Sequence, residues 1–198
     1  DSPIYIEEIA KVGKTIRDKY ADVNIEDGLL NELAEADEPS IFVLNHPNYH
    51  KDKLVYLYLN ALLCQSYVAN SKQANCPHPR ILVSKNMLNV LSKKVADIYR
   101  KMGMISIDAS LDSKNKDKDF NVLTLKSLFM EFLSGKSNIF IFPEGNNSIY
   151  KEKPIRERIQ SGIAHFITKI LSFTNSVRIV PVKLEYGSDK YSIGNIKL

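Results

Sequence analysis

A chain of 198 residues, with 44% hydrophobic and 25% charged residues, has the composition of a globular domain large enough to bury a sizeable core. The formal charge of +4 is mild and its lysines and arginines are scattered among acids, which favours a solvated surface and argues against a nucleic-acid partner. The two cysteines lack metal-site spacing, and the longest apolar stretch, 54–64, is far below the ~20 residues that span a bilayer.

The N-terminal part of the chain is predicted to be helical. Residues 4–20 carry isoleucines, Val12 and Tyr20 at roughly helical spacing, which indicates an amphipathic helix. Its polar positions mix acidic and basic residues, so we expect it to pack on the core rather than on a membrane surface. A second, short helix is predicted at 29–36, where Pro39 ends it.

Strands and helices alternate along the rest of the chain. The predicted strands are 40–44, 81–84, 104–107, 138–142, 177–184 and 191–198. The predicted helices are 52–67, 87–101, 120–133 (closed by Gly135) and 160–173, with polar loops at 70–79 and 112–119. This order indicates an α/β domain with a largely parallel central sheet flanked by helices, in which ligands bind beyond the carboxyl ends of the strands.

No internal repeat or long linker argues for a second domain. We therefore expect one domain over residues 1–198, with an N-terminal helical segment at 1–38 and a core at 39–198. Because the chain starts at Asp1 without an initiator Met, we expect a processed or excised piece, open to truncation at both ends.

The first candidate site follows the strand predicted at 40–44. His46 lies just beyond the carboxyl end of this strand, and Asp52 lies where the next helix is expected to begin. A neutral imidazole takes a proton from an attacking hydroxyl most effectively when a carboxylate holds the ring in one tautomer. Asp52 also suits the role of helix N-cap, and the two roles are compatible.

A metal site is the alternative use of these histidines. His46 and His50 form a His-x-x-x-His pair, which on a helix would place two imidazoles on one face. Pro47 disfavours helix at this point, and no third ligand is evident. We therefore favour a surface or substrate-edge role for His50.

The second candidate site follows the strand predicted at 138–142. The run Phe142-Pro143-Glu144-Gly145 puts a carboxylate on a constrained turn, because Pro fixes the exit from the strand and Gly permits a close backbone approach. Glu144 is suited to accept hydrogen bonds from a substrate hydroxyl. A plain structural turn is the alternative.

Four blocks, in order and spanning roughly residues 22–186, resemble the glycerolipid acyltransferases of the 1-acylglycerol-3-phosphate acyltransferase type. The blocks are Asn45-His46-Pro47-Asn48 with Asp52, then Gly103-Met104-Ile105-Ser106-Ile107-Asp108, then Phe142-Pro143-Glu144-Gly145 with Ser148 and the pair Ser161-Gly162, and finally Ile179-Val180-Pro181-Val182. Most members have four residues between His and Asp. The five in this chain match a His-Pro-Asn branch that includes members resembling glycerol-3-phosphate acyltransferases.

The resemblance implies a glycerol-3-phosphate acyltransferase-like fold and an enzyme at the cytoplasmic face of a membrane, peripherally attached. Such an enzyme moves a fatty acyl group from acyl-CoA or acyl-carrier protein, its co-substrate, to a hydroxyl of a glycerophosphate or lysophospholipid-like acceptor. It implies His46 as general base, Asp52 as its partner, and neither a cofactor nor a metal. The substrate-binding residues that it implies are Asn45, Asn48, Asp108, Glu144, Gly145, Asn146, Asn147 and Ser148.

Two positions depart from the family pattern. After the Pro-Glu-Gly turn the family commonly has Thr-Arg-Ser, where this chain has Asn146-Asn147-Ser148. After the aspartate that ends the second block, Asp108 in this chain, the family commonly has Arg, where this chain has Ala109. Both arginines are associated in the family with the acceptor phosphate, and a bidentate guanidinium is hard to replace. Phosphate binding by other cations is one alternative, and solvated loop charge is the favoured interpretation of each of them: Lys114, Lys116, Lys118, Lys151, Lys153, Arg156 and Arg158. The departures leave two alternatives open: the same chemistry on a non-phosphorylated or unusual acceptor, and a lipid- or acyl-CoA-binding module without turnover.

Overall fold

The computed structural model describes residues 8, 9, 11, 14, 15, 18, 27–36, 38–45, 49–70, 76–108, 118–144, 161–184, 196 and 197. Within these ranges, the side chains of 27–29, 49–55, 118, 119, 161–163, 184, 196 and 197 lie outside the description. The predicted N-terminal helix at 4–20 falls mostly outside the described residues, although the six that are described there are helical and Ile9 is buried.

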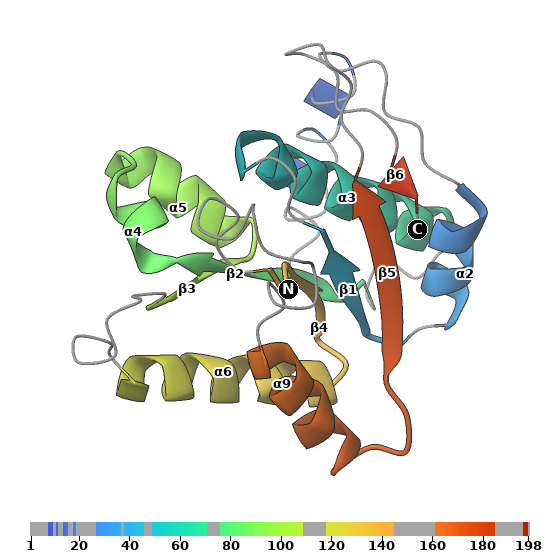
Figure 1. Ribbon diagram of the computed structural model, residues 1–198. Helices are drawn as coiled ribbons and strands as arrows, with labels where there is room; N and C mark the ends of the chain where they lie inside the picture. Colours follow the sequence, from blue (N-terminus) through green and yellow to red (C-terminus); the bar gives the residue numbers. More distant parts are fainter. Residues whose placement is uncertain are drawn as a thin grey trace.

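A single twisted sheet with strand order β3-β2-β4-β1-β5-β6 forms the centre of the molecule (Figure 1). The parallel strands are β1 (Ser40–Leu44), β2 (His78–Ser84), β3 (Met104–Ile107), β4 (Ser137–Ile141) and β5 (Arg178–Leu184). Only β6 (Ile196–Lys197), at the edge, pairs antiparallel among the described strands. The predicted α/β architecture with a largely parallel sheet is confirmed.

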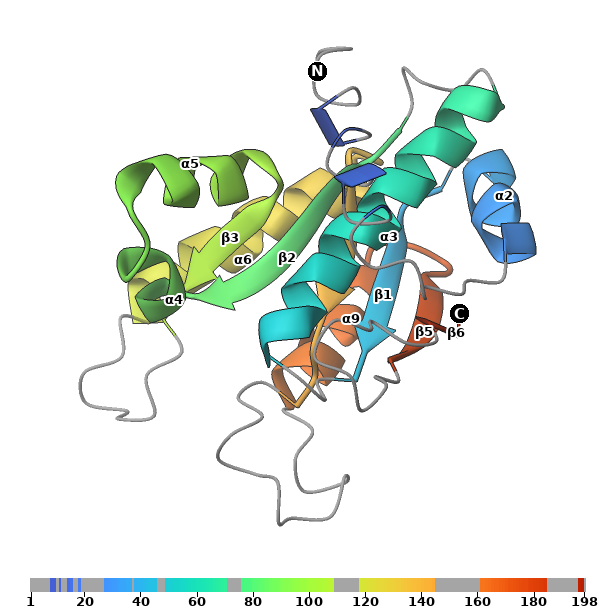
Figure 2. The same cartoon turned by 90° about the horizontal axis from the view of Figure 1, so that it is seen from above.

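Helices cover both faces of this sheet (Figures 1 and 2). One layer contains α2 (Asp27–Ala36), α3 (Tyr49–Ala69), α4 (Lys85–Asn89) and α5 (Lys93–Lys101), and the other contains α6 (Lys118–Leu133) and α9 (Ser161–Leu171). The protein has two hydrophobic cores, one on each face of the sheet, and alternate residues of β1 belong to each. Phe42 and Leu44 are in the first core, on the α3 side, and Ile41 and Val43 are in the second core, on the side of α6 and α9. None of the helices in the described ranges is long and apolar enough to cross a membrane.

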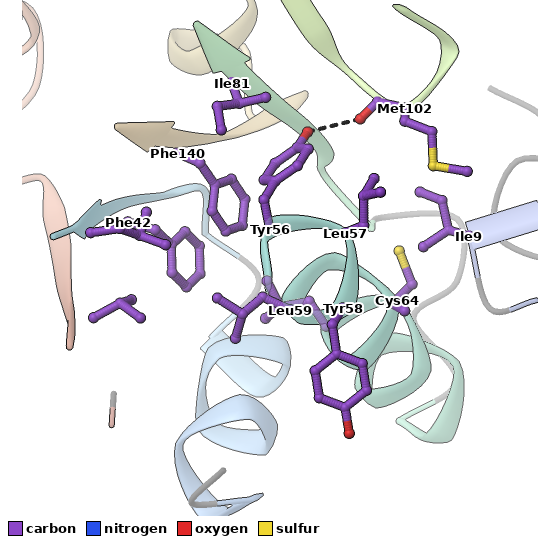
Figure 3. Packing of buried hydrophobic residues seen from close by; sticks show 14 of the residues in the cluster. Ile9, Phe42, Tyr56, Leu57, Tyr58, Leu59, Cys64, Ile81, Met102 and Phe140 are labelled. Carbon is purple, nitrogen blue, oxygen red and sulfur yellow. Dashed lines mark hydrogen bonds between the residues drawn. The ribbon is translucent and has the colours of Figure 1, made fainter. Parts of the chain in front are cut away.

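Aromatic packing fixes α3 against the middle of the sheet (Figure 3). The rings of Phe42 and Phe140, on neighbouring strands, stack with centroids 4.5 Å apart, and Tyr56 of α3 meets Phe140 edge-on at 5.1 Å. The Tyr56 hydroxyl donates to the Met102 carbonyl oxygen at 2.8 Å. Burial raises the pKa of the Tyr56 phenol far above its ordinary value, so the hydroxyl stays protonated and remains a donor.

Several predicted boundaries are wrong. The helix predicted at 52–67 begins three residues earlier, at Tyr49, and the helix at 120–133 begins at Lys118, inside the predicted loop. The helix predicted at 87–101 is two helices, because Ser92 adopts an extended conformation (φ −60°, ψ 149°) as the N-cap of α5, a position that serine favours.

Pro79 was predicted to lie in a loop but belongs to β2. The His78 N–H donates to Lys136 on the β4 side, and the Ile81 N–H donates to Gly103 on the β3 side. Backbone groups alternate between the two sides of a strand, so the nitrogen of Pro79 faces the β3 side, where pairing starts only at Ile81. The proline therefore removes no hydrogen bond from the sheet.

Candidate active site

The carboxyl ends of β1 and β4 lie next to each other at one edge of the sheet. These strands are parallel neighbours, and their last paired residues are Val43 and Ile141. Asn45 follows directly after β1, and Glu144 follows shortly after β4. Both side chains are half-buried. The fold thus brings two predicted site residues, almost a hundred positions apart in the chain, to the same edge.

Asp108 follows β3 at the same edge but farther along it. The strand β2 separates β3 from β4, so the ends of β3 and β4 are two strand spacings, roughly 10 Å, apart. A substrate that contacts both Asp108 and Glu144 must therefore extend across the end of β2.

The side chain of Asn121, near the start of α6, fixes the backbone of Asp108 by two hydrogen bonds. The Asp108 N–H donates to Asn121 Oδ1 at 2.7 Å, and Asn121 Nδ2 donates to the Asp108 carbonyl oxygen at 2.9 Å. Sequence analysis missed Asn121, because a polar residue early in a helix resembles an ordinary solvated position until the partner is known.

Lys85 is a second residue that sequence analysis missed. It follows β2 directly and begins α4, so it lies between the ends of β3 and β4. It is exposed, and its ammonium lies 5.2 Å from the centroid of the Phe120 ring in α6, within the range of a cation–π contact. The signal was available, because Lys85 follows a predicted strand as directly as Asn45 does.

Asp52 lies within α3, past its first residue, Tyr49. The alternative in which Asp52 is the N-cap of this helix is therefore wrong, because an N-cap precedes the first helical residue. Its side chain is outside the description, as is that of His50, which is also in α3. The helix begins earlier than the sequence suggested because Pro47 restricts its own φ and the residue before it, whereas Tyr49 and His50 follow the proline and can be helical.

Several other predicted site residues lie outside the described residues. They are His46, Asn48, Gly145, Asn146, Asn147 and Ser148. The alternative phosphate-binding cations at 114, 116, 151, 153, 156 and 158 also lie outside, and Lys118 begins α6 with its side chain undescribed.

No curated protein matches the chain. A family model described as Acyltransferase matches residues 24–185, which include every strand from β1 to β5 and each of the strand ends described above. Since this match covers most of the chain, the protein belongs to the acyltransferase family, whose substrates are, in general terms, an acyl donor and a lipid acceptor.

Proposed function

We propose that the protein is an O-acyltransferase that moves a fatty acyl group from acyl-CoA or acyl-carrier protein to a hydroxyl of a glycerophosphate or lysophospholipid-like acceptor. The observation that carries the proposal is the pairing of β1 with β4, because it joins at one edge the segments that carry the two main family blocks. His46 is the residue after Asn45, and Glu144 is in the turn after β4.

In the proposed reaction His46 is the general base. It takes the proton of the acceptor hydroxyl as that oxygen attacks the thioester carbonyl carbon, and the C–S bond then breaks. The imidazolium returns the proton to the leaving thiolate, so the products are an ester and a free thiol. Direct attack of this kind needs neither a covalent enzyme intermediate nor a cofactor.

Asp52 is proposed to orient His46 and to stabilise the imidazolium. Its place in α3 supports this role, because it precedes Tyr56 by one helical turn, and residues four apart share a helix face. Tyr56 lies on the face that packs on β4.

Lys85 is proposed to contact the acceptor phosphate in place of the arginines that the family commonly has. Its position after β2 puts a cation between Asp108 and Glu144. A lysine ammonium binds phosphate as a point charge, without the bidentate geometry of arginine. Replacing Lys85 by Ala should raise the Kd for glycerol 3-phosphate, while Lys126→Ala, which removes an exposed lysine on α6, should leave it unchanged.

Because the family's acceptors are, in general terms, lipids, we also propose that the enzyme works at a membrane surface as a peripheral protein. Two alternatives differ in the acceptor or in turnover. Ala109, Asn146 and Asn147, which replace polar or cationic family residues, keep open a non-phosphorylated or unusual acceptor, and a binding module without turnover is the other alternative.

An acceptor screen separates these alternatives. Purified protein is given acyl-CoA or acyl-carrier protein with phosphorylated and non-phosphorylated acceptors, and products are identified by mass spectrometry. The proposal predicts an acylated glycerophosphate or lysophospholipid together with free thiol. Acylation of non-phosphorylated acceptors alone would support the alternative of an unusual acceptor. Donor binding without any product would support the alternative of a binding module without turnover.

A further inference from the structure

Two consecutive residues of α6 hold the ends of two strands at the candidate active-site edge. Asn121 makes both hydrogen bonds to the backbone of Asp108, after β3. Phe120 places its ring 5.2 Å from the ammonium of Lys85, after β2. The start of α6 therefore contacts Asp108 and Lys85, two polar residues that are proposed to bind the acceptor.

The Asn121 contact is specific to a carboxamide. Its Oδ1 accepts from the Asp108 N–H while its Nδ2 donates to the Asp108 carbonyl oxygen, so one side chain satisfies the donor and the acceptor of a single residue. A carboxylate at position 121 would keep the first bond and lose the second. An aliphatic side chain would lose both and leave two half-buried backbone groups without these partners.

The anchoring of α6 in the fold lies elsewhere along the helix. Its buried contacts in the second core come from Leu128 and Phe132, supported by Phe129 and Leu133. Beside Asn121, by contrast, Val122 is 62% exposed and Leu123 is 68% exposed. The contacts of Phe120 and Asn121 thus act on the strand ends rather than on the packing that holds the helix.

We propose that Phe120 and Asn121 are positioning residues, which set the place of Lys85 and Asp108 for binding of the phosphorylated acceptor. This inference rests on the proposed function. Asn121 fixes the backbone from which Asp108 projects, and the Phe120 ring restricts the flexible Lys85 side chain, which otherwise loses rotamer freedom when it binds phosphate.

Equilibrium binding is the primary test because it needs no turnover. The Kd of glycerol 3-phosphate is measured by titration calorimetry for the wild type and for Asn121→Leu, Asn121→Asp and Phe120→Leu. Leu123→Ala, which changes an exposed neighbour on the same helix, is the matched control. We expect Asn121→Leu to raise the Kd about tenfold, Asn121→Asp to raise it less, Phe120→Leu to raise it about threefold and Leu123→Ala to leave it unchanged.

A second measurement separates positioning from a merely structural role. In steady-state assays of thiol release, the acceptor KM should rise in the Asn121 and Phe120 variants while the donor KM stays within error of the Leu123→Ala control. The thermal midpoint of Asn121→Leu should fall because two hydrogen bonds are lost, but a loss of stability alone changes both KM values together. An unchanged Kd in Asn121→Leu, or equal changes in both KM values, overturns the inference. So does a wild type that binds no glycerol 3-phosphate. A wild type that binds it but releases no thiol overturns the proposed reaction, and the Kd series still decides the positioning role.

Discussion

The α-carbon of Gly103 lies so close to the backbone carbonyl oxygen of Pro79 that a Cβ at position 103 would come within 1.8 Å of that oxygen. Gly103 also has φ of +88°, a conformation that residues with side chains rarely adopt. Its carbonyl oxygen accepts the Ile81 N–H at 3.0 Å, just before β2 and β3 begin to pair. The glycine that opens the second sequence block is thus required by the approach of β2.

A matched pair of glycine substitutions tests this relationship. Gly135 also has positive φ, +73°, but nothing lies within 4 Å of its ideal Cβ position. Gly135→Ala should therefore cost only the conformational strain, about 1 kcal/mol, whereas Gly103→Ala should cost at least ~2 kcal/mol more because the Pro79 backbone must move. Urea unfolding of both variants measures the difference. Equal losses of unfolding free energy would show that the contact with Pro79 carries no cost.

Replacing Tyr56 by Phe tests the bond that ties α3 to the end of α5. The substitution keeps the ring that packs on Phe140 but leaves the buried Met102 carbonyl oxygen without the hydroxyl donor. We expect the free energy of unfolding to fall by about 1–2 kcal/mol. Denaturant titrations of Tyr56→Phe and wild type check this value, and an unchanged midpoint would mean that the hydrogen bond contributes nothing to stability.

His78, at the start of β2, should make stability depend on pH. Burial is the main cause that lowers the pKa of His78 below its ordinary value, and the nearby Arg80 guanidinium lowers it further, against an opposing effect of Glu131. The fold thus favours the neutral imidazole. The neutral His78 side chain therefore contributes to the free energy of unfolding above the unfolded-state pKa of about 6.5. This contribution is lost as the pH falls through the lower folded-state pKa of His78.

The thermal midpoint of wild type and His78→Gln, measured from pH 8 down to pH 5, checks the direction. The wild type should lose more stability than His78→Gln as the solution becomes acidic. His165→Gln, which changes an exposed histidine on α9, serves as the control and should follow the wild type. Parallel curves for wild type and His78→Gln would contradict the assignment.

The two cysteines should differ in reactivity. Their sulfur atoms lie 3.5 Å apart, both thiols are free, and Cys64 is buried whereas Cys76 is partly exposed. The hydrogen bond with Cys76, and then burial, raise the pKa of the Cys64 thiol well above its ordinary value. Because the thiolate is the reactive form, an alkylating reagent near neutral pH should modify Cys76 first. Peptide mapping after timed alkylation measures the order, and faster modification of Cys64 would refute it.

The sequence was sufficient for the order of strands and helices because the apolar runs are short, continuous and well separated. The runs at 40–44 and 104–107 match β1 and β3, and Gly135 ends α6 as predicted, with Gly135 N–H bonded to Phe132 and Lys136 N–H to Glu131. Pro79 was assigned to a loop because a proline fits a strand only where its nitrogen faces a side without hydrogen bonds to a neighbouring strand. Which side is hydrogen-bonded depends on the tertiary structure and not on the local sequence.

The candidate site was only partly accessible to sequence reasoning. Asn45 and Asp108 were proposed from the family resemblance and Glu144 also from its turn, and all three lie just after the ends of parallel strands, where ligands are expected to bind. Their roles in the site stay predictions. Asn121 could not be predicted, since its role comes from a hydrogen-bond partner thirteen residues away across the start of a helix. Lys85 directly follows a predicted strand and could have been found, but it was overlooked because the helix that it begins was predicted to start later, at Met87.

The most direct test of the proposed reaction is the rate of thiol release from acyl-CoA by wild type and by His46→Ala, measured with a saturating glycerophosphate acceptor. His165→Ala, which removes an exposed histidine from α9, is the control and should match the wild type. The account predicts that His46→Ala lowers the rate by ~10²–10⁴-fold while its thermal midpoint stays unchanged. Equal rates for wild type and His46→Ala would contradict it.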